Sequence, residues 1–188
     1  MKLKIFFATC GLSAALLPAA WGASTTGTIN ATLTLTTGCL VNGQSGTSGV
    51  SFGTLDFGAQ AATFDTLNAT LQNSAGSGIF VRCTTDQSYN VRITNSNTAP
   101  ATVYGDRTAA PRYLRLSSDN TVGIAYSLYG STSYTTPIAN DTDLVAVGTP
   151  DPVNGDNYPI YGRITGGGFN AAIPAGTYTD TINVAVNY

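Results

Sequence analysis

The sequence ends in "GTYTDTINVAVNY", residues 176–188, where apolar side chains occupy every second position. Successive side chains of a β-strand point to opposite sides, so Ile182, Val184, Val186 and Tyr188 share one face of a predicted strand. That face has to be buried, yet the sequence contains no later segment to pair with the strand. We therefore expect its open edge to be covered by an earlier segment or by another polypeptide.

The remaining sequence also consists of short alternating segments separated by Gly, Pro, Asn and Asp turns, and no stretch has helical periodicity. Alternation is clearest in "GIFVRCT" (78–84) and "YNVRITN" (89–95). Many short strands at this spacing predict an all-β sandwich or barrel. The strands expected are 29–35, 50–57, 67–71, 78–84, 89–94, 113–117, 123–129, 160–164 and 178–188, with long loops at 95–111 and 131–157.

The first 22 residues, "MKLKIFFATCGLSAALLPAAWG", contain two lysines, an apolar run and then small residues. This order predicts a secretory signal peptide, residues 1–22, cleaved after Gly22. The apolar run of about 13 residues is shorter than the roughly 20 that a membrane-spanning helix needs. Removal of the signal leaves residues 23–188, the length of one domain.

Loss of Lys2 and Lys4 with the signal leaves six arginines and ten aspartates, a net charge of −4, and no Lys, Glu or His. A surface without a basic stripe is not expected to bind nucleic acid. The usual general bases are missing, so we expect no enzyme, no catalytic residue and no cofactor. The aspartates of "NDTD" (140–143) and "TPDPVNGDN" (149–157) do not have the spacing of a helix–loop–helix calcium site, and no metal site is expected.

Cys39 and Cys83 are the two cysteines that remain after the signal peptide is removed. An even pair in an exported chain predicts one disulfide, the alternative being two separate buried thiols. Cys83 lies on the same face of its predicted strand as Ile79 and Val81, as a buried bridge requires. A bridge closing a loop of about 45 residues contributes roughly 4 kcal/mol by the chain-entropy estimate.

The segment "ASTTGTINATLTLTTG", residues 23–38, carries no charge and no proline. Its apolar residues alternate with Asn30, Thr32 and Thr34, and they are Ile29, Ala31, Leu33 and Leu35. An exposed strand of this kind is prone to aggregate. It could be the first strand of its own sheet, or it could be donated to the open sheet of another molecule, and the residues alone favour neither placement.

The chain resembles the spore coat protein U-like family and, within it, the major pilins of archaic, Csu-type chaperone–usher pili. The resemblance spans residues 23–188. It rests on an ordered set of motifs: "GCLV" (38–41), "FGTLDFG" (52–58), "VRC" (81–83), "YLRL" (113–116), "IAYSLYG" (124–130) and "PAGTYTDTINVAVNY" (174–188).

The resemblance implies an incomplete immunoglobulin-like β-sandwich that is completed by donor-strand complementation. Residues 23–37 would be the donor-strand extension, and residues 38–188 would be the pilin domain, with Ile182, Val184 and Val186 in the acceptor groove. A periplasmic chaperone would complete the subunit first and hold the carboxylate of Tyr188. An outer-membrane usher would then exchange the chaperone strand for the extension of an identical or related subunit.

By this resemblance the protein is a major structural subunit of a surface fimbrium of a Gram-negative bacterium, supporting attachment and biofilm formation. Two alternatives stay open. One is a secreted coat-type protein that keeps residues 27–36 in its own sheet. The other is an adhesive or carbohydrate-binding sandwich that uses some of its ten tyrosines. Tyrosine is also common in strands, where it packs on the pleated surface.

Overall fold

The computed structural model describes residues 25–166 and 173–188, and all regular secondary structure in these ranges is β-strand. Within them, no helix is long and apolar enough to cross a membrane. The strands are β1 (Cys39–Val41), β2 (Thr54–Leu55), β3 (Thr66–Asn73), β4 (Gly76–Ser77), β5 (Ile79–Cys83), β6 (Asn90–Asn95), β7 (Thr102–Tyr104), β8 (Arg112–Leu116), β9 (Asp119–Tyr129), β10 (Asp156–Tyr158), β11 (Tyr161–Thr165), β12 (Tyr178–Thr179) and β13 (Asn183–Asn187).

The chain divides into two units, residues 1–35 and 36–188. The described part of the first unit, residues 25–35, has no regular secondary structure and is exposed throughout. The second unit contains every strand of the described chain. The predicted signal peptide, residues 1–22, lies outside the described residues.

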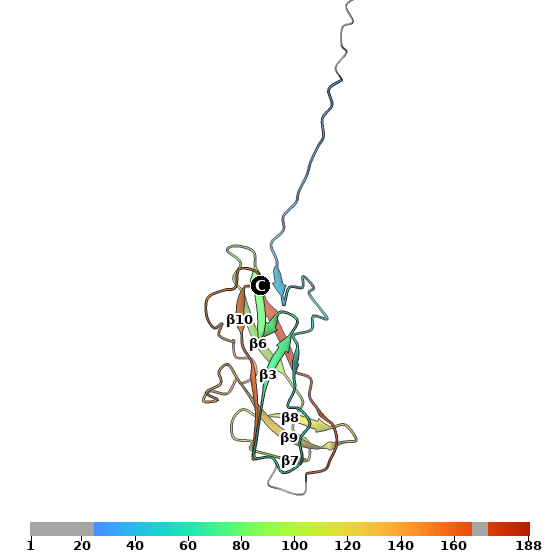
Figure 1. Cartoon of the computed structure of the whole chain (residues 1–188), viewed down its shortest axis with the longest axis vertical. Helices are drawn as coiled ribbons and strands as arrows, with labels where there is room; N and C mark the ends of the chain where they lie inside the picture. The colour runs from blue at the N-terminus through green and yellow to red at the C-terminus, as the bar shows by residue number, and fades with distance from the viewer. Residues whose placement is uncertain (1–24, 167–172) are drawn as a thin grey trace, which may run out of the picture. The chain divides into compact units, whose positions relative to one another are not determined.

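The larger sheet of the second unit has the order β12-β8-β9-β11-β3-β2, with β4 paired to β3 and β7 paired in parallel to β9. Its antiparallel ladders bring distant segments together, for example Ile164 opposite Leu67 and Gly162 opposite Leu128. Gly162 has to be small, because a Cβ atom there would lie 2.7 Å from the Leu55 side chain and 2.8 Å from the Phe57 ring. In Figure 1, β3 runs along the body of this unit and β7, β8 and β9 cross one end of it.

A second layer is built from the sheet β1-β5-β10 and from the pair β6-β13. Residues 143–147 connect these two pieces. The Leu144 N–H donates to Val91 O in β6 at 2.7 Å, and the Val147 N–H donates to Asn157 O in β10 at 2.8 Å. Among the described residues, β6 is the only strand that pairs with β13, so the C-terminal strand forms an edge of this layer.

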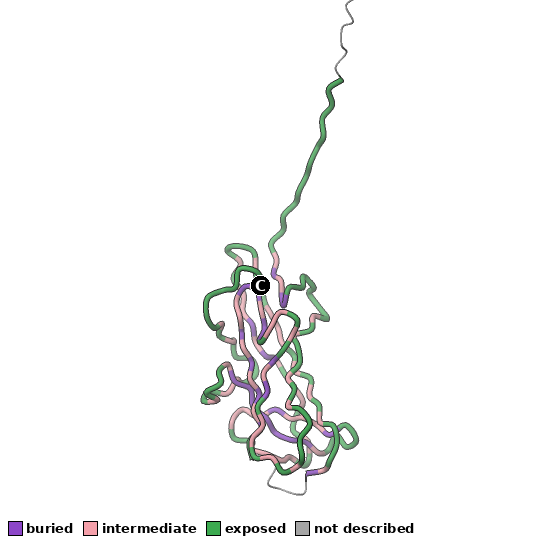
Figure 2. Tube along the Cα trace, in the orientation of Figure 1, coloured by how far each residue is buried: buried purple, intermediate pink, exposed green. Residues whose placement is uncertain are grey.

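The hydrophobic core fills the space between the layers with side chains from both. The most completely buried of them are Tyr126, Ile79, Ile93, Leu128, Val81 and Val91. Figure 2 shows the buried residues along the middle of the strands, with exposed residues in the connections. Arg112 is the buried cation of the described core, 2% exposed, and its guanidinium donates to Ile138 O and Asn140 Oδ1, each at 2.8 Å.

The all-β prediction is confirmed, and most predicted strands overlap an observed one. Five predictions were wrong in detail. Residues 29–35 form no strand, because their backbone has no ladder partner in the described chain. Residues 50–57 contain only the two-residue strand β2. The predicted loops at 95–111 and 131–157 contain β7 and most of β10, which have three residues each and are too short to show alternation.

The fifth difference concerns the C-terminal run, residues 178–188, which was predicted as one strand. It is two strands in different layers, because β12 pairs with β8 and β13 pairs with β6. Residues 180–182 make the crossing between the layers. This crossing is the structural feature on which the site described below depends.

The predicted disulfide is confirmed: Cys39 and Cys83 are bonded. They lie directly opposite each other in the β1–β5 ladder and are 44 positions apart in sequence. The bridge therefore fixes the strand that follows the N-terminal extension to the buried strand β5.

Replacing both cysteines with alanine is expected to lower the free energy of unfolding by about 2–5 kcal/mol, because the unfolded chain loses a long covalent loop. Urea unfolding of the oxidised protein and the variant measures this. Wild-type protein kept in reductant is the matched control and should unfold like the variant. Equal stability of oxidised and reduced protein would contradict this role of the bridge.

Candidate strand-binding groove

Three adjoining hollows run along the C-terminal residues of the second unit. The first, about 830 Å³, lies between residues 46–53 and 181–188. The second, about 350 Å³, shares Phe52, Gly53, Ile182 and Val184 with the first. The third, about 440 Å³, lies between residues 55–64 and 173–178 and shares residues with the second, namely Leu55, Phe57 and Leu114. Neighbouring hollows share lining residues, and we call the three together the strand groove.

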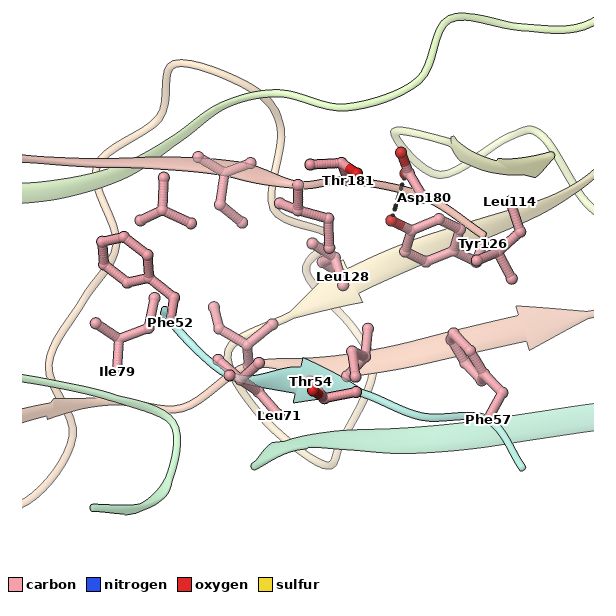
Figure 3. A pocket seen from close by; sticks show the side chains of 16 residues that line it. Phe52, Thr54, Phe57, Leu71, Ile79, Leu114, Tyr126, Leu128, Asp180 and Thr181 are labelled. Atoms are coloured by element: carbon pink, nitrogen blue, oxygen red, sulfur yellow. Dashed lines mark hydrogen bonds between the residues drawn. The ribbon is translucent and has the colours of Figure 1, made fainter. Parts of the chain in front are cut away.

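The floor of the strand groove is the hydrophobic core itself. Ile79, Ile93 and Leu128, all at most 1% exposed, line the middle hollow. Figure 3 shows Leu128 and Tyr126 between two facing segments, one carrying Phe52, Thr54 and Phe57 and the other carrying Asp180 and Thr181. A sandwich that is covered on all sides would have a strand between these segments. Here the side chains of the core are reached from the groove.

One wall of the strand groove is the C-terminal run. Ile182, Val184 and Val186 are half-buried and pack against the core, and Tyr188 at the end is 50% exposed. All four residues, predicted from their alternation, line the same hollow. The backbone of β13 pairs with β6 on one side and with no described strand on the other.

The facing wall, residues 50–57, is held by side-chain amides where a strand ladder is missing. Asn42 Nδ2 donates to Ser51 O at 3.2 Å, and Asn73 Nδ2 donates to Phe52 O at 3.3 Å. Asn42 is buried and also accepts the Phe80 N–H on Oδ1 at 2.9 Å. Gly53 has φ +119°, and a Cβ atom there would collide with Gln72 O. Sequence reasoning missed both asparagines, because isolated Asn residues look like ordinary turn formers.

A polar anchor fixes the point where the C-terminal run crosses between the layers. Tyr126 Oη donates to Asp180 Oδ2 at 2.7 Å, and the Asn97 N–H donates to Asp180 Oδ1 at 2.8 Å. Asn97 Nδ2 also donates to Thr179 O at 3.1 Å and to Tyr113 O at 3.2 Å. Asp180 therefore ties residues 179–181 to β8, β9 and the Asn97 loop.

The electrostatics of the anchor follow from burial. Burial raises the pKa of Tyr126, and the neighbouring Asp180 carboxylate raises it further, while Arg112 opposes the shift. Arg112 lies opposite Tyr126 in the β8–β9 ladder, and burial lowers its pKa. The phenol is thus neutral and acts as a hydrogen-bond donor to the carboxylate. Nothing in the sequence around Asp180, Tyr126 or Arg112 predicted that they meet.

The residues predicted to form a donor strand are exposed to solvent, as a segment that enters another molecule's sheet must be. Ile29, Leu33 and Leu35 are 97%, 82% and 83% exposed, and Ala31 is also exposed. Large apolar side chains are rarely left this open on a folded surface, and an exposed apolar segment indicates a binding role or an aggregation hazard. Residues 25–38 contain no strand in this structure.

Several aspartates serve as turn formers. The Asp106 carboxylate accepts the Thr108 N–H at 2.9 Å, and this bond lowers the pKa of Asp106. Asp119 accepts from the Thr121 hydroxyl and N–H, which lowers its pKa in the same way. In residues 25–166 and 173–188, no group of three His, Cys, Asp or Glu side chains could hold a metal ion.

A family model for the Spore Coat Protein U domain matches residues 25–185. Domains of this kind occur in chaperone–usher pilus subunits and in coat proteins, which are structural or adhesive proteins found outside the cell or on its surface. No curated protein matches the chain. The matched range covers the exposed N-terminal segment and nearly all of the strand groove.

Tyr126→Phe is expected to lower stability by about 1–3 kcal/mol at neutral pH, because Asp180 loses a buried hydrogen bond. The free energy of unfolding of the variant should also fall less steeply at alkaline pH than that of the wild type. The pKa of Tyr126 is higher in the folded protein than in the unfolded chain, where tyrosine ionises at a pH of about 10. The stabilisation by the neutral phenol is therefore complete below that pH. It is lost as the pH rises toward the pKa of Tyr126 in the folded protein.

Denaturant unfolding between pH 7 and 11 measures both effects. Tyr113→Phe is the matched control, since Tyr113 lies on the neighbouring strand β8 and its hydroxyl makes no hydrogen bond within the described chain. Equal losses in the two variants would show that the Asp180 anchor does not stabilise the fold.

Proposed function

The chain belongs to the Spore Coat Protein U domain family, and on that premise we propose that it is the major structural subunit of a chaperone–usher pilus. Subunits polymerise by donor-strand exchange, in which the N-terminal extension of one copy fills the strand groove of the next. The observation that carries this proposal is the strand groove, which is lined by half-buried apolar side chains beside the unpaired edge of β13.

The groove and the extension fit in length and chemistry. The groove wall from Ile182 to Tyr188 and the alternating segment from Ile29 to Leu35 are both seven residues long. An added strand supplies main-chain hydrogen bonds to β13, and its alternate side chains enter the apolar hollows. Burial of Ile29, Leu33 and Leu35 contributes about 5–9 kcal/mol before the entropy of ordering the segment is subtracted.

The same arrangement accounts for polymer growth. The donor segment and the acceptor groove are different surfaces of one chain, so each copy that donates still has a free groove. Such head-to-tail contacts do not have to close into a ring, and repeated contacts of this kind build a filament. The product is a fibre of identical or related subunits on the cell surface, which supports attachment and biofilm formation.

An open core also explains the partners that we propose for assembly. A subunit with an uncovered apolar groove and an exposed apolar segment would aggregate if it were released alone into the periplasm of a Gram-negative bacterium. A periplasmic chaperone covers the strand groove during export, contacting Ile182, Val184 and Val186 and the carboxylate of Tyr188. An outer-membrane usher then exchanges that cover for the extension of the next subunit.

The coat-type alternative, in which residues 27–36 complete their own sheet, is less well supported. These residues contain no strand, and their large apolar side chains are exposed. A carbohydrate-binding function is less well supported too, since Tyr126, Tyr129 and Tyr158 are buried, and the buried Tyr126 hydroxyl is bonded to Asp180.

Deleting residues 24–36 is expected to leave a chaperone-bound subunit that is exported but forms no fibres. Electron microscopy of cells and purified surface fibres, with the subunit identified by mass, measures this. Ordinary fibres from the deletion variant would refute the donor role of the extension.

Leu33→Asp is expected to block polymerisation, because a charge without a partner would enter the apolar groove at a cost of several kcal/mol. Thr32→Asp is the matched control: it adds the same charge on the other face of the same segment and should still assemble. Fibre yield per cell measures both variants. Similar yields would show that this face of the segment is not buried in the fibre.

A further inference from the structure

Two rows of side-chain amides cross the outer face of the C-terminal sheet and end at the open edge of β13. Asn187 lies opposite Asn90, and its Nδ2 donates to Asn90 Oδ1 at 2.8 Å. Asn183 lies opposite Asn95, and its Nδ2 donates to Asn95 Oδ1. Ala185 lies between the two rows. The outer face of the last strand is therefore polar at two positions that are four residues apart.

Asp143 fixes the direction of the hydrogen bonds in the first row. A carboxylate only accepts hydrogen bonds, and Asp143 accepts from Asn90 Nδ2 at 3.4 Å and from Arg92 Nε at 2.8 Å. Asn90 therefore turns its Oδ1 toward Asn187, and Asn187 turns its amide nitrogen toward Asn90. The Oδ1 of Asn187 is left at the open edge and accepts no hydrogen bond from the described residues. Asn183 has the same orientation in the second row.

The outward residues of the N-terminal segment have the matching pattern. Asn30, Thr32 and Thr34 alternate with the apolar residues, and each carries an N–H or O–H donor. Asn30 and Thr34 flank Thr32 at the same spacing at which Asn187 and Asn183 flank Ala185. Asn30 is the one asparagine in the seven-residue segment.

Ladder geometry connects the two patterns, because residues opposite each other in a ladder lie on the same face of the sheet. In full overlap, Ile29, Ala31, Leu33 and Leu35 face the groove beside the wall from Ile182 to Tyr188. The same overlap places Thr32 opposite Ala185, and Asn30 and Thr34 opposite the two asparagines. This holds whether the incoming strand runs antiparallel or parallel to β13.

We propose that Asn30 and Thr34 of an incoming copy extend the two amide rows and thereby stabilise the exchanged strand. This inference rests on the proposed function and names residues outside the apolar face that contribute to it. A slip by one residue is opposed by the apolar residues, since it turns every apolar side chain outward. A slip by two keeps the apolar face inward but leaves only threonine hydroxyls opposite the two asparagines, so full overlap is the register in which Asn30 continues an amide row.

The test compares Asn30→Thr with Asn30→Val in fibres of the full-length subunit. The two side chains have the same shape and both favour strands, but only threonine keeps a donor. We expect the valine fibres to release subunits in guanidinium about 1.5- to fivefold faster than the threonine fibres. Thr32→Val is the matched control: it makes the same hydroxyl-to-methyl change opposite Ala185, and its fibres should release subunits no faster than wild type.

Double-mutant cycles identify the partner. Asn30→Ala is combined with Asn187→Ala in one cycle and with Asn183→Ala in the other. The effects of the single changes on the rate of subunit release should be non-additive in only one of the two cycles. Coupling to Asn187 means an antiparallel donor, and coupling to Asn183 means a parallel one. Equal release rates for the threonine and valine fibres, with additive effects in both cycles, would overturn the stabilising role of the two rows. That outcome is distinct from failure of the proposed function, in which Leu33→Asp would still polymerise.

Discussion

A hydrophobic core that is open along one side, next to a strand edge with free backbone groups, is the constraint on which the rest of this structure depends. Apolar side chains in contact with water and unpaired edge groups both favour the addition of another strand. In the strand groove, the two features lie side by side, because β13 is at once the edge of its layer and a wall of the opening. An added strand would satisfy both with a single segment.

The opening persists because each of its two walls is held by side-chain hydrogen bonds. The C-terminal run is held at its crossing by Asp180, which accepts from Tyr126 and Asn97. The facing wall is held by Asn42 and Asn73, which donate to backbone carbonyls of residues 51 and 52. These bonds use side chains and leave the strand edge of β13 free. Polar residues inside the sandwich therefore keep the groove in shape, while apolar residues provide its affinity.

Residues 23–188 contain Asp and Arg but no Lys, Glu or His, and this choice of residues also has structural reasons. Aspartate is short enough to bond the backbone two residues further along its own turn, as Asp106 and Asp119 do, which suits a chain built from many tight connections. The buried Arg112 guanidinium donates to a backbone carbonyl and to the amide oxygen of an asparagine. Asn residues hold a groove wall and form rows across the last sheet. Charge and amide groups thus maintain the fold, and none of these uses requires Lys, Glu or His.

The sequence by itself determined the β class and the disulfide partners, because alternation and cysteine count are properties of neighbouring or few residues. Period-2 patterns correctly marked β3, β5, β6, β8, β9 and β11. Strands of three residues, such as β7 and β10, are too short to carry such a pattern. The tertiary structure alone decided that residues 178–188 are divided between two layers, and that Asp180 meets Tyr126 across 54 residues. Contacts between residues so far apart are set by how the layers pack, and local periodicity contains no information about that packing.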